Sequence, residues 1–199
     1  MTPRPRSFDE NTVLARAKDI FWRKGYEATS MQDLVDHMQI GRQSLYNTFG
    51  DKHTLYMRAL GHYLEHDHKP ALGRLGEPGA SLADVERFFD NQLGRMVGYE
   101  DRRSCFVVNA IQELSPRDSE VNVVGIRYRE ELQQVFTAAL HTAKERGEAS
   151  AEVDAPAAAR VLTQLVLGMS VMWKSNATAE DLRTTRDATL APLRGTCST

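Results

Sequence analysis

The stretch TSMQDLVDHMQIGRQSLYNTFGDK, at residues 29–52, determines the fold that we expect for the first part of the chain. Its first half carries apolar residues at helical spacing, namely Met31, Leu34, Val35 and Met38. After a break at Gln39-Ile40-Gly41, Leu45 and Phe49 stand four residues apart, which is again helical spacing. Two short helices joined by a tight turn form a helix-turn-helix, and the sequence predicts this arrangement here.

The second of these helices is predicted to expose a dense set of polar side chains, which are Arg42, Gln43, Tyr46 and Asn47. Arginine can bond the edge of guanine, glutamine and asparagine can bond adenine, and tyrosine can bond a phosphate. An ordinary bundle of three helices would also bury Leu45 and Phe49, but it would leave this polar face unexplained. We therefore interpret the face as a surface that reads a nucleic acid.

The composition is that of a globular protein without an excess of positive charge. The chain has 199 residues, of which 41% are hydrophobic, and its formal net charge is −2. This balance argues against a strongly non-specific, histone-like binder but allows a local DNA-reading surface. The length allows one domain or two small ones. Residues 1–7 include Arg4 and Arg6, and they are predicted to form either a basic arm that contacts the DNA backbone or a frayed terminus.

The cysteines and the apolar runs indicate the compartment. Cys105 and Cys197 are far apart and do not suggest a disulfide framework, which fits a reducing cytosol. The N-terminus lacks the apolar core of a signal peptide, and the apolar runs stay well below 18 residues, so no membrane span is expected. We expect a cytoplasmic protein that associates with the nucleoid when it is bound to DNA.

Local signals predict where the helices around the motif begin and end. Gly25 is expected to end the first helix, and Thr29, with Gln32 three residues later, is expected to cap the second. Asp51 is expected to cap the fourth helix and to place Lys52 in its first turn. A cation beside free backbone N–H groups at a helix start suits a phosphate.

Three segments together form a specific pattern: FWRKGYEATS at residues 21–30, Leu34-Val35, and IGRQSLYNTFGDK at residues 40–52. Through them, residues 12–60 resemble the DNA-binding domain of the tetracycline-repressor (TetR/AcrR) family of bacterial regulators. The resemblance implies an all-α fold, with an N-terminal three-helix helix-turn-helix domain followed by a helical ligand-binding and dimerisation domain. The family commonly has serine at position 41 and a small residue at position 43, where this chain has Gly41 and Gln43.

The same resemblance implies which side chains face DNA: Thr29, Arg42, Gln43, Ser44, Tyr46, Asn47 and Lys52. Thr29, Tyr46 and Lys52 would hold phosphates. Arg42, Gln43 and Asn47 are the candidates for base contacts, and Gln43 is the position where the operator sequence is expected to differ from that of relatives.

The remainder of the chain is predicted to be helical. We expect a DNA-binding domain at 1–52, a connecting helix at 53–72, and an effector-binding and dimerisation domain at 73–199. The glycine- and proline-rich segment PALGRLGEPGA at 70–80 is expected to be a loop. Apolar periodicity and capping residues predict body helices at 82–99, 104–114, 116–146, 156–174 and 179–194.

The connecting helix contains the pattern His62-Tyr63-Leu64-Glu65-His66, which matches a short zinc-protease motif in inverted order. Two histidines four residues apart share a helical face and can bind a metal. Solvated histidines near a helix end are the alternative, and it is favoured because no further ligand follows at a recognisable spacing. We therefore predict no metal and no cofactor.

Cys105 is predicted in the first turn of its helix, behind Arg102 and Arg103. A helix N-terminus and neighbouring cations both lower the pKa of a thiol. The segment from Cys105 to Asn109 also resembles one branch of the family, some of whose members respond to electrophiles or oxidants. The alternative is a small buried residue, which is the usual role of a free cysteine.

The resemblance further implies a homodimer and a ligand pocket. Helices 156–174 and 179–194 would form a four-helix bundle with a second copy, and the broad apolar face of 156–174 fits this role. Candidate pocket residues, for which ordinary core packing is the alternative, are Phe89, Met96, Phe106, Tyr128, Met169, Met172 and Trp173.

The sequence therefore predicts a DNA-binding transcriptional regulator and not an enzyme. We expect a repressor released from double-stranded, palindromic operator DNA by a small apolar or aromatic effector. Two alternatives remain open: a regulator switched through Cys105, and, more remotely, a helical metal protein that uses His62 and His66.

Overall fold

The computed structural model describes residues 9–195, which are helical apart from turns, loops and one isolated bridge between Ala149 and Arg194. Arg4, Arg6 and Cys197 lie outside the described residues, so the predictions about the basic arm and the second cysteine do too. The chain forms two compact units, Met1–Asp67 and His68–Thr199. The division falls inside the segment 53–72 that was predicted to connect the domains.

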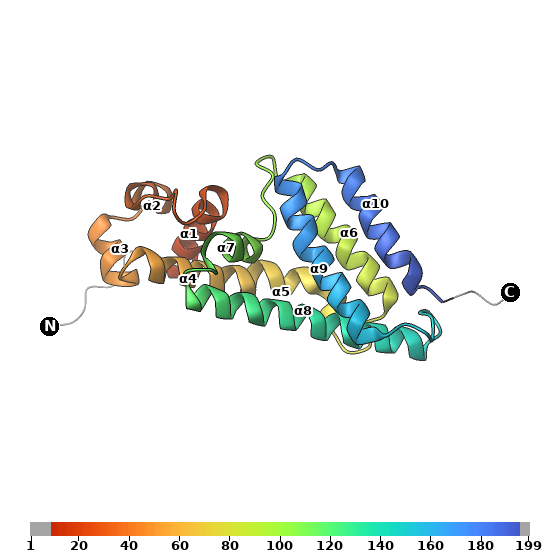
Figure 1. Ribbon diagram of the computed structural model, residues 1–199. Coiled ribbons are helices and arrows are strands. Elements are labelled where there is room, and N and C mark those ends of the chain that lie inside the picture. The colour runs from red at the N-terminus through yellow and green to blue at the C-terminus, as the bar shows by residue number, and fades with distance from the viewer. Residues whose placement is uncertain (1–8, 196–199) are drawn as a thin grey trace. The chain divides into compact units, whose positions relative to one another are not determined.

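Unit 1 consists of α1 (Glu10–Lys24), α2 (Met31–Met38), α3 (Arg42–Phe49) and α4 (Lys52–Tyr63), which Figure 1 shows in red to orange. A π-helical turn, η1 (Leu64–His68), follows α4. Helix α1 packs against α2 and α4. Edge-to-face contacts join Phe21 to Tyr56 at 5.0 Å and Trp22 to Tyr63 at 5.1 Å between ring centroids. These aromatic pairs fix α4 against α1, and α4 supports the short helices α2 and α3.

The caps of unit 1 agree with the sequence except at one position. Asp9 caps α1, Gly25 ends it, and Asp51 caps α4. Helix α2, however, is capped by Ser30 in a capping box with Asp33, and the prediction of Thr29 was wrong. The reason is that the Thr29 hydroxyl donates a hydrogen bond to the Gly25 carbonyl and is not available to α2.

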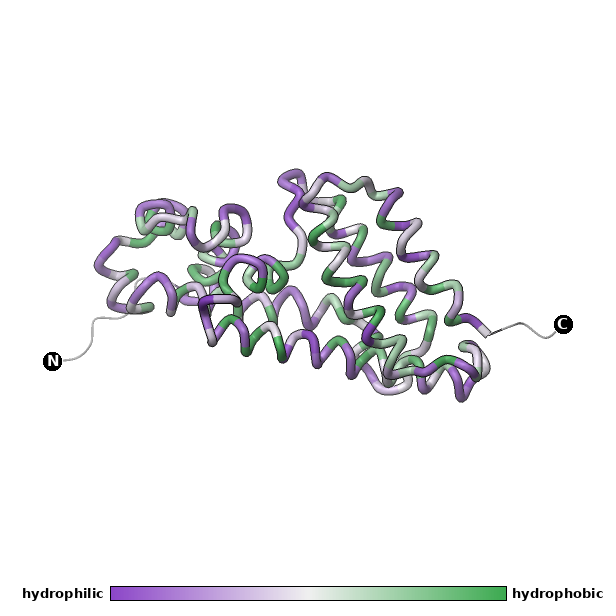
Figure 2. The backbone as a smooth tube through the Cα atoms, in the orientation of Figure 1, coloured by the Kyte–Doolittle hydropathy of each residue, from purple (hydrophilic) through white to green (hydrophobic). Residues whose placement is uncertain are grey.

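Unit 2 consists of α5 (Lys69–Leu72), a 3-10 turn η2 (Gly73–Gly76), α6 (Leu82–Gly98), α7 (Phe106–Leu114), α8 (Ser119–Glu145), α9 (Ala155–Lys174), α10 (Ala179–Leu190) and a 3-10 turn η3 (Ala191–Leu193). Figure 1 shows α6, α9 and α10 side by side, with the long α8 beneath them. Phe88, Phe89 and Phe136 form an aromatic cluster in the core, with ring centroids 5.4–5.8 Å apart. Apolar residues recur along each helix on the faces that pack together (Figure 2).

Three predicted boundaries in this region differ from the structure. The expected helix 52–72 is interrupted by η1, and only residues 77–80 of the expected loop lack helical structure. Helix α8 starts at Ser119 and not at Pro116, because the backbone N–H groups of Arg117 and Asp118 bond the Leu114 carbonyl and close a turn after α7. The side chain of Asp118 then caps α8.

Helices α7 and α8 approach closely at Gly125. A Cβ atom at this position would lie 2.8 Å from the Ile111 side chain, so a larger residue would push the two helices apart. The close approach holds the part of α7 around Ile111 against α8.

Helix α9 is more apolar than the length of its uninterrupted apolar runs indicates. Its 20 residues are long and apolar enough to cross a membrane, with a mean hydropathy of 1.3 over 18 residues. Its apolar runs are short, but valine, leucine and alanine keep the average high between polar residues. Such a helix is also typical of a protein core, and α9 packs against α7, α8 and α10.

Candidate functional site

Helix α3 has one buried face and one polar face. Leu45 is fully buried and Phe49 nearly so, which anchors the helix on unit 1. Arg42, Gln43, Tyr46 and Asn47 are exposed on the rest of its surface, as the spacing predicted. The Gln43 amide donates a hydrogen bond of 2.8 Å to the Asn47 side-chain oxygen. The two amides are therefore held together as one hydrogen-bonding group.

Lys52 adds a cation to this part of unit 1. It is the first residue of α4, behind the Asp51 cap, and it is half-buried. Its ammonium group lies 4.4 Å from the centre of the Tyr26 ring, a cation–π distance. The ring thus holds the lysine in place while leaving its hydrogen atoms available to an anion.

Two other predicted contact residues have different surroundings. Thr29 is fully buried and bonded to Gly25, so its hydroxyl does not face solvent. Ser44 is half-buried on α3.

At the start of α2, Lys24 lies 2.8 Å from Asp33, and it acts together with the Ser30 hydroxyl to hold the pKa of Asp33 well below its usual range. The carboxylate is therefore charged and fixes the entry to α2.

The recognition surface consists of Arg42, Gln43, Tyr46, Asn47 and Lys52, presented by a helix-turn-helix. Its residue types are those that bond base edges and phosphates. The turn contains Gln39 in the left-handed conformation (φ 57°), which ends α2 and allows the chain to reverse direction. This combination defines a helix-turn-helix DNA-binding protein.

The comparisons with known proteins identify the family. Residues 13–59 match the bacterial regulatory proteins of the tetR family, and residues 81–189 match the tetracyclin repressor-like C-terminal domain. The chain belongs to the TetR family of transcriptional regulators, which are DNA-binding proteins and not enzymes.

Two curated relatives cover nearly the whole chain. The HTH-type transcriptional regulator YezE of Bacillus subtilis (strain 168), itself uncharacterized, is 34% identical over 191 residues, which is 96% of this chain and 98% of YezE. The HTH-type transcriptional repressor ComR of Escherichia coli (strain K12) is 28% identical and covers 94% of this chain and 90% of its own length.

A solved structure agrees with the fold along the chain. It is a cysteine mutant of the TetR family transcriptional regulator CifR, complexed with 26-base-pair double-strand operator DNA. CifR is 31% identical, with a TM-score of 0.82 over 94% of this chain and 98% of the CifR chain.

Unit 2 contains a small cavity between α6, the start of α7, and α9. Its lining residues are Phe89, Gln92, Met96, Cys105, Val166, Met169 and Ser170. Its volume of about 10 Å³ is close to what one water molecule needs. Phe89, Met96 and Met169 were among the predicted pocket residues.

The other predicted pocket residues lie elsewhere. Phe106, Tyr128 and Trp173 are buried but do not line the cavity, and Met172 is 52% exposed on the outside of α9. Gln92, Val166 and Ser170 were not predicted. Val166 lies three residues before Met169 on α9, and Ser170 lies four residues after Val166, a helical spacing that could have indicated both.

Cys105 is buried and is the N-cap of α7, so it lies one residue before the helix and not in its first turn as predicted. Its thiol donates a hydrogen bond of 3.3 Å to the Tyr128 hydroxyl. The two arginines that precede it point to other partners: Arg102 bonds the carbonyl groups of Trp173 and Ala177, and Arg103 bonds the Asp101 carboxylate. Both guanidinium groups are therefore engaged in other contacts.

Tyr128 connects this thiol to a buried histidine. The Tyr128 ring lies 4.8 Å from the ring of His68, and His68 Nε2 lies 3.0 Å from a carboxylate oxygen of Glu131. Burial lowers the pKa of His68, although the Glu131 carboxylate acts in the opposite direction. The imidazole is therefore harder to protonate than a histidine in solvent.

His62 and His66 stack with ring centroids 4.1 Å apart, and His66 Nδ1 lies 3.0 Å from the His62 carbonyl oxygen. Within residues 9–195, no group of three histidine, cysteine or acidic side chains is arranged to hold a metal ion.

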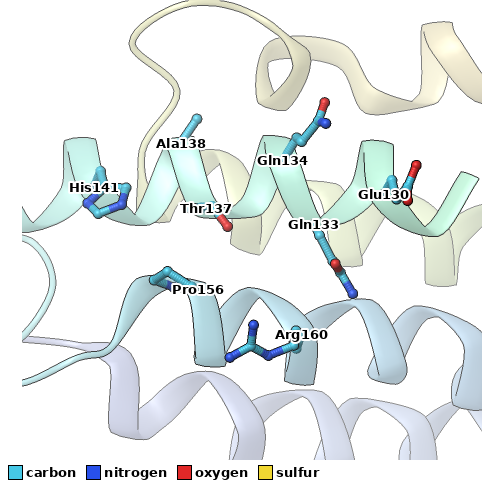
Figure 3. A pocket seen from close by; sticks show the side chains of 8 residues that line it. All are labelled: Glu130, Gln133, Gln134, Thr137, Ala138, His141, Pro156 and Arg160. Carbon is cyan, nitrogen blue, oxygen red and sulfur yellow. The ribbon is translucent and has the colours of Figure 1, made fainter. Parts of the chain in front are cut away.

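A larger open groove lies on the surface of unit 2 between α8 and α9 (Figure 3). It has a volume of about 630 Å³ and is lined by Glu130, Gln133, Gln134, Thr137, Ala138, His141, Pro156 and Arg160. Because this groove is open to solvent, it would enclose little of an apolar molecule, so the small cavity is the better candidate for such a ligand.

Proposed function

We propose that this protein is a homodimeric repressor that binds a near-palindromic operator and is released from it by a small molecule bound in unit 2. It acts in the cytoplasm, on the nucleoid. The observation that carries the proposal is the recognition surface on α3, whose exposed side chains have no role in the core of unit 1. CifR binds double-strand operator DNA, and ComR is named a repressor. Both relatives support operator binding and repression by this chain.

We assign separate roles to the residues of the recognition surface. Arg42 and the bonded pair Gln43–Asn47 would contact bases, while Tyr46 and Lys52, which lies over the Tyr26 ring, would contact phosphates. Thr29 is left out of this set because it is buried. Gln43 is long and is held by Asn47. We therefore propose that it contacts the base pair at which this operator differs from the operators of relatives.

Dimerisation is supported by the outer face of α9. Val161, Val171 and Met172 are exposed to 50%, 36% and 52%, although they belong to a long and apolar helix. A row of exposed apolar side chains on one helix face is typical of an interface. Together with α10 it would form the four-helix bundle of a two-fold dimer, and that symmetry would set the spacing of two half-sites.

The small cavity supports the release step. Its lining is mostly apolar, which fits an apolar or aromatic effector. The effector would bind better to the form of the dimer whose DNA-binding units are wrongly spaced. A coupling of about 1–3 kcal/mol suffices to change operator affinity by 5- to 150-fold.

A second candidate is release by modification of a thiol. It is favoured by the position of Cys105 in the cavity wall, where a reactive compound that enters the cavity would meet sulfur. The solved CifR structure carries altered cysteines, which makes the thiols of this group worth testing. If Cys105→Ser protein is still released from operator DNA by N-ethylmaleimide as wild type is, this candidate fails.

A metal-based role for His62 and His66 is the remote alternative. Metal analysis of protein purified without a histidine tag tests it, and a stoichiometric zinc signal would support it.

Footprinting on the DNA that flanks the gene of this protein tests the main proposal. We expect a protected near-palindrome whose protection weakens as salt rises, because phosphate contacts release counterions. The Arg42→Ala variant should lose protection and keep its helical content. Absence of protection by wild-type protein at any salt concentration would contradict the proposal.

A further inference from the structure

The strongest unexplained feature of unit 2 is the buried amide of Asn109. The residue is only 8% exposed, and among residues 9–195 neither atom of its amide has a hydrogen-bond partner. Buried polar groups are bonded in more than about nine cases in ten. Leaving one unbonded costs roughly 1–3 kcal/mol. A partner outside the chain would remove this cost.

The indole N–H of Trp173 is a second buried group of this kind. Trp173 is 6% exposed, and its Nε1 also has no acceptor among the described residues. The Arg102 guanidinium covers the face of the indole at 4.0 Å, but it contacts the ring and carries no acceptor. Trp173 therefore presents one hydrogen-bond donor, and Asn109 presents donors and an acceptor.

Both groups lie one helical turn from the wall of the small cavity. The backbone N–H of Asn109 bonds the carbonyl of Cys105, a cavity-lining residue four positions earlier. Trp173 follows Met169, another lining residue, by four positions on α9. Residues four apart on a helix share a face. Each of the two unbonded groups therefore follows a cavity-lining residue by one turn, Asn109 on α7 and Trp173 on α9.

A ligand would have to widen the cavity to reach the amide and the indole N–H. At about 10 Å³ it is too small for an organic molecule. Met96 and Met169 form part of its wall, and methionine is unbranched and adapts its shape readily. A ligand that displaces these side chains would reach apolar surface and, at its edge, the amide and the indole N–H.

The lining also defines the charge of the ligand. None of the seven lining side chains, from Phe89 to Ser170, is charged, and the guanidinium nearest to Trp173 is already bonded to two backbone carbonyl groups. A charged group would lose its water without gaining a counterion, which is strongly unfavourable. The head group of the ligand should therefore be neutral.

We propose that the effector is a small aromatic molecule with an uncharged head group that both donates and accepts a hydrogen bond, and that Asn109 and Trp173 recognise this group. This inference rests on the proposed function, because it specifies the effector of the same regulator. Asn109 acts as the specificity-determining residue, and the free protein is less stable because its amide is unbonded.

Binding of four matched compounds tests the proposal: benzamide, acetophenone, cumene and benzoate. None has a leaving group or an activated double bond, so thiol modification does not contribute. We expect benzamide to bind the full-length protein at least about tenfold more tightly than cumene, which corresponds to one added hydrogen-bonding group. Acetophenone, which only accepts, should lie between them, and benzoate should give no rise in melting temperature.

Variants assign the effect to the named residues. In Asn109→Leu the preference for benzamide over cumene should fall to about twofold or less, while the free protein should melt at a higher temperature. Thr163→Val is the matched control, because the buried Thr163 hydroxyl is already bonded to the Ala159 carbonyl. It should leave the preference unchanged and should not raise the melting temperature. If Asn109→Leu does not fold, Trp173→Phe removes the N–H and should abolish the acetophenone advantage.

Equal affinity for benzamide and cumene, a preserved preference in Asn109→Leu, or no binding of any of the four compounds would overturn the inference. Operator binding by the same protein samples, measured without compound, distinguishes failure of this inference from failure of the proposed function. If the operator is bound and the head-group preference is absent, only this inference fails. If the operator is not bound at all, the proposed function fails as well.

Discussion

The hydrogen bond between Gln43 and Asn47 predicts how a change of Gln43 affects operator binding. Replacing Gln43 with alanine removes one amide and frees the other, so a base contact is lost and Asn47 is no longer fixed. We expect operator affinity to fall about tenfold, with relaxed discrimination at one base pair of each half-site. Binding to a set of operators with single base-pair changes measures both effects.

Lys52→Ala is the matched comparison for Gln43→Ala, because it removes a phosphate contact and not a base contact. Its affinity should fall by a similar factor for every operator variant, and the slope of log affinity against log salt should decrease by about one. A change in base preference in Lys52→Ala, or none in Gln43→Ala, would contradict the roles assigned to them.

The buried His68 predicts a pH dependence of stability. Burial lowers its pKa in the folded protein below the value of 6.5 expected when unfolded, so on acidification the unfolded chain binds the proton first. Stability should therefore be full above about pH 6.5 and decline below it, by at most about 1.4 kcal/mol per pH unit. Glu131 opposes the shift, whereas Arg95 and Lys69 reinforce it.

Urea unfolding between pH 7.5 and 5.5 measures this slope. His68→Gln should flatten it, while His141→Gln, a change at an exposed position on α8, should leave it as in wild type. His62 also has a pKa lowered by burial and contributes its own part, which remains in both variants. An unchanged slope in His68→Gln would show that His68 is not the group responsible.

At the level of single residues, the sequence predicted what depends on local spacing and missed what depends on distant partners. The polar face of α3 follows from the positions of Leu45 and Phe49 alone. The burial of Thr29 depends on a carbonyl left free by the end of α1, and the unbonded amide of Asn109 depends on what the helices packed against α7 offer it. Neither can be read from helical periodicity.

At the level of elements, Arg102 holds the end of α9. Its backbone is left-handed (φ 52°), and its guanidinium donates to the carbonyl groups of Trp173 and Ala177 at 2.7–3.0 Å. The last carbonyl groups of a helix lack partners within it. From the loop between α6 and α7, Arg102 donates to one of them, the Trp173 carbonyl, and to the Ala177 carbonyl just beyond the helix, and so it ties the segment before Cys105 to the end of α9.

Arg102→Ala should destabilise the protein by about 2 kcal/mol, the range of a hydrogen bond to a charged group. Hydrogen exchange of the amides at 174–178 should become faster, because the end of α9 loses its cap. Arg103→Ala is the control, since Arg103 bonds Asp101 within its own loop. Equal exchange rates at 174–178 in the two variants would rule out the clamp.

The elements themselves were largely predictable, because helix ends are determined by nearby residues. Asp51 caps α4 as the sequence predicted, and Ser81, Asp154 and Thr178 cap α6, α9 and α10 from the position directly before each helix. The errors arose where a competing turn formed. Pro116 fits a first helical position, but the backbone bonds that close the end of α7 use that segment. The spacing of apolar residues around Leu64–His68 does not predict the π-helical turn η1.

At the level of the whole molecule, the proposed operator binding depends on pairing two copies through α9 and α10. A charged residue introduced into the exposed apolar row of α9 should therefore weaken DNA binding, although this row is not part of the recognition surface. In Met172→Glu, a side chain that is 52% exposed in the single chain would place a carboxylate in the dimer interface, where it loses its water without a counterion. We expect a folded monomer with the same helical content as wild type.

The monomer should bind operator DNA at least about a hundredfold more weakly than wild type, because two half-sites are no longer engaged together. Analytical ultracentrifugation and operator titration of the same samples measure the two properties. Val123→Glu, a change at a residue on α8 that is 44% exposed, is the control and should remain a dimer with full affinity. If Met172→Glu stays dimeric, α9 is not the interface. If it is monomeric yet binds the operator with full affinity, each copy reads DNA alone and the spacing of half-sites cannot be the property that an effector changes.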